Sequence, residues 1–76
     1  MGMNANNWRD RIVCDPHLHH GEPCIRGTRI AVSVIVGTLA DMTIDEILCH
    51  YPQITREDVQ AALLYAAEAA HNTLVA

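Results

Sequence analysis

The chain has 76 residues, half of them hydrophobic, with one tryptophan, two tyrosines and no phenylalanine. A chain of this length forms one small domain and lacks room for the deep pocket that most enzymes use. Its net charge of −4 and its lack of lysine leave it without the broad basic surface typical of nucleic-acid-binding proteins. The composition predicts a small aliphatic core and argues against catalysis.

The chain is expected to divide into a tail and one domain. Residues 1–10 begin with a polar, patternless stretch, which predicts a flexible N-terminal tail. Residues 11–76 form the single domain, with a β arm over 11–32 and a helical body over 33–76. No segment is long and apolar enough to span a bilayer, and no secretory leader opens the chain. We expect a cytoplasmic protein without membrane contact.

The β arm is predicted to contain three short strands. Residues 11–14 are β-branched at their centre and favour the first strand. Residues 23–26 and 29–32 are expected to pair around Gly27-Thr28, because glycine readily takes the positive φ that a type II′ turn requires. So small a sheet is marginal in water and needs a covering layer, which predicts a homodimer through the arm. The apolar residues to be covered are Ile12, Ile25 and Ile30.

Arginines are the strongest candidates for binding residues, because the guanidinium group suits carboxylates and phosphates. The predicted turn sets Arg26 opposite Arg29, where the two cations repel unless an anion lies between them or each pairs with an acid of the same chain. Arg11 and Arg56 complete the candidate set for a protein or nucleic-acid partner. An anion-binding role and an internal structural role account for these residues equally well.

Two helices are expected directly after the arm. The first covers about residues 34–41, with Ser33 as its cap and an interior glycine that weakens it by about 1 kcal/mol. The second begins at the capping box from Thr43 to Glu46. It ends near His50, because the proline at position 52 disfavours helical backbone before it.

The third helix is predicted to begin at Thr55 and to run to about His71. Its periodicity gives an apolar face that would pack against the second helix. Leu64 and Tyr65 border that face and suggest a subunit contact. The face comprises Val59, Ala62, Leu63, Ala66, Ala67 and Ala70.

The second and third helices, joined by a short turn, predict a helix-turn-helix arrangement similar to that of homeodomains. A DNA-reading helix presents basic or amide side chains at its N-terminus. Here Arg56 is followed by Glu57 and Asp58, whose carboxylates phosphate would repel. Packing therefore accounts for this helix better than DNA recognition does.

Histidines and cysteines offer weak metal candidates. His17, His19 and His20 match only part of a zinc-binding spacing. The three cysteines are odd in number and lack a Cys-x-x-Cys pair, which predicts free thiols. No nucleophile–base pair or paired-carboxylate site is visible. We expect no cofactor and no enzymatic activity.

Together these segments resemble the family called domain of unknown function 433. The resemblance covers about residues 11–70 and is carried by Gly21-x-Pro-x-Ile-Arg-Gly-Thr-Arg-Ile30, Tyr51-Pro52 and Thr55-x-Glu-Asp-Val59. It implies a β arm followed by a three-helix body, an α+β fold that is mainly α. Some relatives are similar to antitoxins paired with nuclease-like toxins.

Three functions remain open from the sequence. The first is a non-catalytic interaction module similar to the antitoxin half of such a pair, with a nuclease-like protein as its partner. The second is a DNA-binding regulator that uses the arginine-bearing arm and the helix-turn-helix. The third is a small metal-binding protein.

Overall fold

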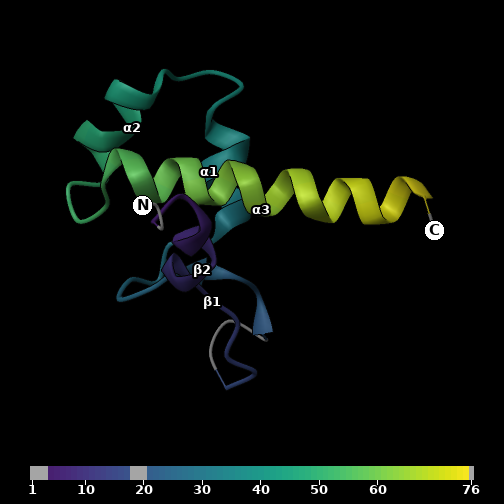
Figure 1. Cartoon of the computed structure of the whole chain (residues 1–76). Helices are drawn as coiled ribbons and strands as arrows, with labels where there is room; N and C mark the ends of the chain where they lie inside the picture. The colour runs from purple at the N-terminus through teal and green to yellow at the C-terminus, as the bar shows by residue number, and fades with distance from the viewer. Residues whose placement is uncertain (1–3, 18–20, 76) are drawn as a thin grey trace.

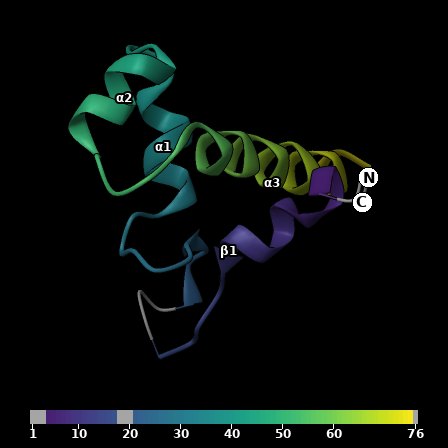
Figure 2. The ribbon, with the colours of Figure 1, turned by 60° about the vertical axis from the view of Figure 1, so that its left-hand side comes forward.

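The computed structural model describes residues 4–17 and 21–75, which form a mainly helical α+β structure and confirm the predicted fold class (Figure 1). The elements are, in chain order, the 3₁₀ helix η1 (Asn4–Arg11), the strands β1 (Ile12–Val13) and β2 (Cys24–Ile25), and the helices α1 (Val32–Thr38), α2 (Ile44–His50) and α3 (Arg56–Val75). Helix α3 is the longest element, and both α1 and η1 pack along it. In the view of Figure 1, its C-terminal half extends to the right of the other elements, and Figure 2 shows η1 on the same side of the molecule as this half.

The core lies between the three helices and continues beneath the β arm. Ile25 and Ile30 are buried in it, and Ile12 packs against it from β1. The arm is therefore covered by the helical body of its own chain, because α1 follows the arm directly and folds back over it. The expected need for a second subunit to cover these isoleucines does not arise. The large side chains buried completely are Ile25, Ile35, Ile47 and Val59.

The β arm has a different pairing from the one expected. Strand β2 pairs antiparallel with β1, with Ile12 opposite Ile25, and meets the following segment only at a bridge between Cys24 and Ala31. The Ile25 N–H also donates to the Ile30 carbonyl at 2.9 Å, which keeps the predicted register. Residues 29–32 do not form the predicted strand, because the helix α1 already begins at Val32.

The turn itself lies one residue earlier than expected. The Thr28 N–H donates to the Ile25 carbonyl at 3.0 Å, so Gly27, with φ 79°, occupies the third position of the turn. A type II turn requires positive φ at this position, and glycine supplies it without strain. The Thr28 hydroxyl donates to the same carbonyl and accepts from the Ile30 N–H, which locks the turn. The Arg26 N–H donates to the Arg11 carbonyl, so Arg26 is paired with the η1–β1 segment and not with Arg29.

The N-terminal segment is helical where the sequence predicts a flexible tail. Residues 4–11 form η1, which packs against α3 and is followed directly by β1. The difference arises from contacts with distant residues: Arg9 pairs with Glu68 and Arg11 with Asp58, both on α3. Such long-range partners leave no local pattern in the sequence.

The predicted capping box forms at the start of α2, and a similar pair of bonds caps α3 at the predicted start, Thr55. Thr43 and Glu46 cap α2 reciprocally. The Thr55 N–H donates to the Asp58 carboxylate at 2.9 Å, and the Asp58 N–H donates to the Thr55 hydroxyl at 3.2 Å. Helix α1 differs, because Ala31 is its N-cap and the Ser33 hydroxyl donates instead to the Glu22 carboxylate.

The buried face of α3 is rotated relative to the predicted one. Val59, Ala61 and Ala62 are buried, whereas Leu63 keeps 39% of its surface exposed and Leu64 keeps 47%. The expectation that Leu63 is a core residue is therefore wrong. The reason is that α3 is covered mainly by α1 and η1, with fewer contacts to α2, which turns Leu63 toward solvent. In the described part of the chain, no helix combines the length and the apolarity needed to cross a bilayer.

Candidate protein-binding site

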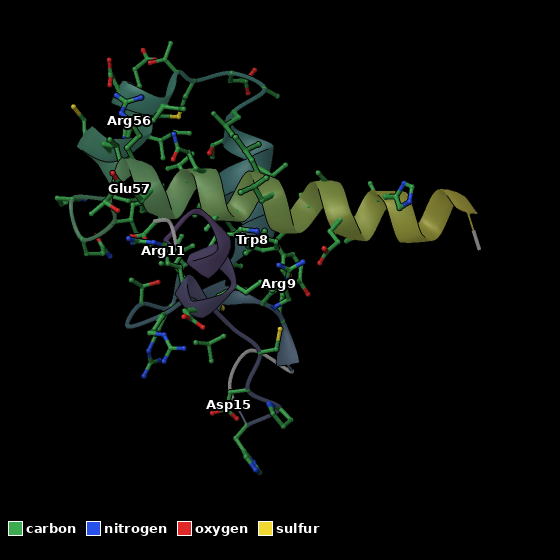
Figure 3. The ribbon with its side chains drawn as sticks, viewed as in Figure 1. Trp8, Arg9, Arg11, Asp15, Arg56 and Glu57 are labelled. Carbon is green, nitrogen blue, oxygen red and sulfur yellow. The ribbon has the colours of Figure 1, made fainter. Side chains whose placement is uncertain are left out.

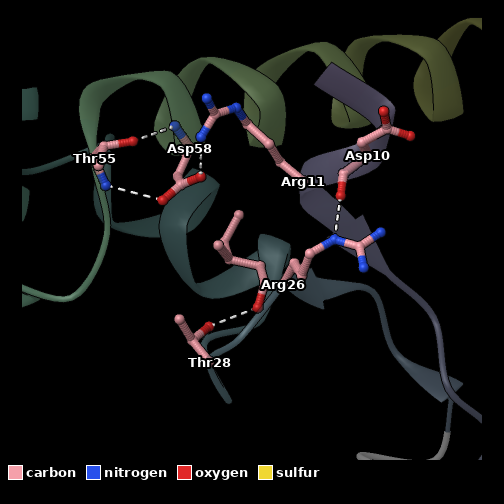
Figure 4. A network of polar contacts seen from close by, with 7 residues as sticks. Asp10, Arg11, Arg26, Thr28, Thr55 and Asp58 are labelled. Carbon is pink, nitrogen blue, oxygen red and sulfur yellow. Dashed lines mark hydrogen bonds and ion pairs between the residues drawn. The ribbon is translucent and has the colours of Figure 1, made fainter. Parts of the chain in front are cut away.

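Three of the four candidate arginines are engaged within the chain. Arg11 donates from Nη1 to the Asp58 carboxylate at 2.9 Å, and the Arg26 Nε donates to the Asp10 carbonyl (Figure 4). Arg56 forms an ion pair with Asp45 of α2. These contacts fasten η1 to α3, the turn to η1, and α2 to α3. Of the two roles predicted for the arginines, anion binding and internal pairing, internal pairing accounts for Arg11, Arg26 and Arg56.

Arg29 is the exception among the four. It is exposed on the turn segment, and no side chain in the described ranges 4–17 and 21–75 bonds to its guanidinium group. It borders a shallow depression of about 320 Å³ that Arg26 and Gly27 also line. The structure does not bring Arg29 together with Arg11 or Arg56 in a shared contact, so the four arginines do not form one site.

A second cluster joins η1 to the middle of α3. The Arg9 guanidinium lies over the Trp8 ring, 4.4 Å from its centroid, and pairs with Glu68 (Figure 3). These residues border a pocket of about 210 Å³ that also contains Cys14 and Tyr65. The Cys14 Sγ lies 3.9 Å from the Tyr65 hydroxyl, a contact that raises the pKa of Tyr65, with burial adding to the effect. The polar side chains of this pocket thus pair with one another, Arg9 with Glu68 and Cys14 with Tyr65.

A mostly apolar concavity lies between α1 and α3. It has a volume of about 460 Å³, and we call it the α1–α3 groove. One wall is the exposed side of α1, and the floor is the part of α3 that continues past it. Gly37 lies on this wall beside open space, since a methyl group built there would meet no atom within 4 Å. The residues that line the groove are Glu22, Pro23, Val32, Ser33, Val36, Gly37, Tyr65, Ala66 and Ala69.

The sequence did not predict this groove. Its walls come from the β arm, α1 and α3, which are separated along the chain, so no local motif marks it. The interior glycine of α1, Gly37, lies on one wall of the groove, but a glycine that weakens a helix does not by itself mark a binding surface.

The metal candidates remain without a site in the described residues. His17 lies at the end of residues 4–17, and its backbone N–H donates to the Asp15 carboxylate at 2.8 Å. His19 and His20 fall outside the residues that the structure describes. Within those residues, no three histidine, cysteine or acidic side chains lie close enough together to hold a metal ion.

All three cysteines are free thiols: Cys14 and Cys49 are exposed, and Cys24 is buried. Burial raises the pKa of the Cys24 thiol, and the nearby Glu22 carboxylate adds to this. The folded state thus holds this proton more tightly than the unfolded chain. The associated stability is complete below the ordinary thiol pKa and is lost as the pH rises past the folded value.

We therefore expect iodoacetamide at mildly alkaline pH to modify Cys14 and Cys49 well before Cys24, since thiolate content and access both limit the reaction. Peptide mass spectrometry over a time course measures the three rates. Denatured protein is the control, in which the three rates should converge. Modification of Cys24 as fast as Cys49 in the native protein would contradict the burial of this thiol.

A model of the family described as "Protein of unknown function (DUF433)" matches residues 12–66. This match covers more than half of the chain. The chain belongs to this family. No curated protein and no solved structure matches it.

The family match separates two parts of the structure. The β arm, α1, α2 and the first half of α3 lie inside the matched range, and so do all residues of the α1–α3 groove except Ala69. The helix η1, with Arg9 and Arg11, lies outside it, as does Glu68. The groove is thus formed almost entirely by the matched range, whereas both residues of the ion pair between Arg9 and Glu68 lie outside it.

Proposed function

We propose that this protein is a non-catalytic, protein-binding module and that the α1–α3 groove holds its partner. The observation that carries the proposal is the groove itself, an open and mostly apolar concavity that the domain leaves uncovered. Contiguous exposed apolar surface on a soluble domain marks a site of interaction with another molecule. The aromatic ring of Tyr65 and the aliphatic side chain of Val36, both part-exposed, offer anchoring surface for an inserted side chain.

The charge of the protein favours a basic partner. The net charge is −4, and exposed carboxylates project from the α1–α2 loop, α2 and the start of α3. A basic protein would be steered toward this surface, and apolar residues of that protein would then fill the groove. A cationic nuclease-like protein, as in the toxin–antitoxin pairs that the family resemblance suggests, has this chemistry. The exposed acids are Asp41, Asp45, Glu46 and Glu57.

A pair of substitutions at Gly37 tests the groove. Gly37→Glu places a charged side chain in the groove without straining the backbone, because Gly37 is helical and open space surrounds it. We expect it to weaken the complex with the protein encoded by the neighbouring reading frame at least about tenfold, since burying an unpaired carboxylate is costly. Calorimetric titration after co-expression measures the affinity.

Gly37→Ala is the matched control for this experiment. Alanine should raise the free energy of unfolding by about 0.5–1 kcal/mol through helix propensity while leaving the groove open. The complex should therefore survive in Gly37→Ala. A complex that forms equally well with Gly37→Glu would place the interface elsewhere and refute the role of the groove.

Arg29 supports a second candidate function, DNA binding through the β arm. It is exposed and has no ion-pair partner among the residues described. Because the start of α3 is acidic around Glu57, contact with DNA would use the arm and not this helix. A gel-shift assay with the DNA upstream of the gene, titrated with salt, tests this function. Arg29→Ala should abolish any salt-sensitive shift, whereas Gly37→Glu should not affect it. The absence of a shift at low salt would reject DNA binding.

A further inference from the structure

The five arginines of the chain fall into two groups according to the charge of their partners. Arg9, Arg11 and Arg56 each form an ion pair with a carboxylate. Arg26 donates instead to a backbone carbonyl, which carries no net charge, and the Arg29 guanidinium bonds to no group in residues 4–17 and 21–75. These two arginines both line the depression of about 320 Å³ beside the turn, which we call the turn depression. Its other lining residues are Val13, Ile25, Gly27 and Thr28.

The missing carboxylate partners do not reflect a shortage of acids. The chain has nine acidic side chains, all within the described residues. In the first 30 residues, the carboxylates of Asp15 and Glu22 accept hydrogen bonds from other groups, and that of Asp10 points away from Arg26 (Figure 4). The acids of α2 lie above α3 in Figures 1 and 2, whereas the segment between β2 and α1 lies below it. No carboxylate of the described chain therefore neutralises the two cations.

The guanidinium group of Arg26 is held in position by its own segment. The Arg26 N–H donates to the Arg11 carbonyl at 2.7 Å, and the Nε donates to the Asp10 carbonyl. The two terminal nitrogens have no acceptor among the described residues (Figure 4). A guanidinium group fixed through Nε can donate from these nitrogens to two oxygens of one oxyanion, and ordering it in advance lowers the entropic cost of binding.

The charge of the turn depression selects the class of ligand. Its two guanidinium groups carry one positive charge each, and a phosphate monoester carries about −1.5 to −2 at pH 7. A carboxylate or a phosphodiester carries only a single negative charge. A long polyanion is disfavoured as well, because the protein as a whole has a net charge of −4. Val13, which is part-exposed, offers apolar surface to the carbon atoms beside the phosphate.

We propose that the turn depression binds a phosphate monoester, whose oxygens accept from the terminal nitrogens of Arg26 and from the guanidinium group of Arg29. The site shares no lining residue with the α1–α3 groove, so it does not depend on the proposed partner binding. It also differs from the DNA-binding candidate, because DNA offers one charge on each phosphodiester. Both a small metabolite and a phosphorylated side chain of another protein carry the required group.

Titration of the full chain with methyl phosphate, followed by NMR of the backbone amides and the arginine Nε–H groups, tests the proposal. We expect saturable shifts that are largest for the Gly27 and Arg29 amides and the Arg26 Nε–H. Dimethyl phosphate has nearly the same size but a single charge, and it should bind at least about tenfold more weakly, since a charge-assisted contact is lost. Equal affinities for the two esters, or no saturable shifts, would overturn the proposal.

Arg29→Ala should weaken the binding of methyl phosphate at least about tenfold, because half of the positive charge is removed. Arg56→Ala is the matched control, since it removes the same charge at the start of α3 and should leave the affinity unchanged. Arg26→Lys keeps the charge but loses the planar fork, and it should also weaken binding. Circular dichroism checks that each variant is folded. An equal loss in Arg29→Ala and Arg56→Ala would refute a site at the turn.

Two further titrations identify the source of the phosphate. A phosphoserine peptide that binds at least about tenfold more tightly than free phosphoserine would assign the site to a phosphorylated protein. Equal affinities would assign it to a small phosphate ester. Duplex DNA without terminal phosphates should not displace methyl phosphate from the turn depression. Displacement by such DNA would overturn the proposal in favour of DNA binding through the arm.

Discussion

Replacing Ile35 with alanine should remove most of the stability of this domain. Ile35 is completely buried at the centre of the core, where α1 meets α3 and the β arm. Removing three of its carbon atoms loses the transfer free energy of the side chain and leaves a cavity, which together cost about 2–5 kcal/mol. A small single core supplies about 3–5 kcal/mol in total. Urea denaturation followed by circular dichroism should show a folded population that is marginal even without denaturant.

Leu63→Ala is the matched comparison, because the sequence pattern placed Leu63 on the buried face of α3. At 39% exposure it loses little burial on truncation, so we expect a change in the free energy of unfolding below about 1 kcal/mol. A cost for Leu63→Ala equal to that of Ile35→Ala would contradict the orientation of α3.

After Ile35→Ala, Asp58→Ala should be the most destabilising of these substitutions. Asp58 is 8% exposed, and its carboxylate accepts from the Thr55 N–H that opens α3 and from Arg11 of η1. The lost cap costs about 1 kcal/mol, and the groups left unpaired in a part-buried position bring the total to about 2–4 kcal/mol. Thermal unfolding followed by circular dichroism measures the loss.

Hydrogen exchange distinguishes the two roles of Asp58. In Asp58→Ala, the amides of η1 should exchange faster as well as those of the first turn of α3, because Arg11 loses its partner. Asp58→Asn keeps an acceptor for the Thr55 N–H and should affect η1 more than the cap. Asp45→Asn is the control, since it removes the exposed pair with Arg56, in which Asp45 is 81% exposed. It should cost at most about 0.5 kcal/mol.

The parts of the fold that were predicted correctly depend on neighbouring residues in the chain. The capping boxes at Thr43 and Thr55 mark the starts of α2 and α3, because a cap joins residues only three positions apart. The fold class and the register between Ile25 and Ile30 follow from equally local patterns. The family relationship is also carried by short motifs, of which the segment from Gly21 to Ile30 is the longest.

What the sequence by itself determined is thus the order of the first two strands and the three α-helices, and the family of the domain. Only the tertiary structure decided which faces are buried, because that depends on partners distant along the chain. Asp58 could be assigned as a cap, but its pairing with Arg11 required η1 to cross α3. Leu63 and Ala62 are adjacent in sequence and both apolar, and the packing of α1 and η1 on one side of α3 alone placed Ala62 inside and Leu63 in solvent. The same packing opened the α1–α3 groove.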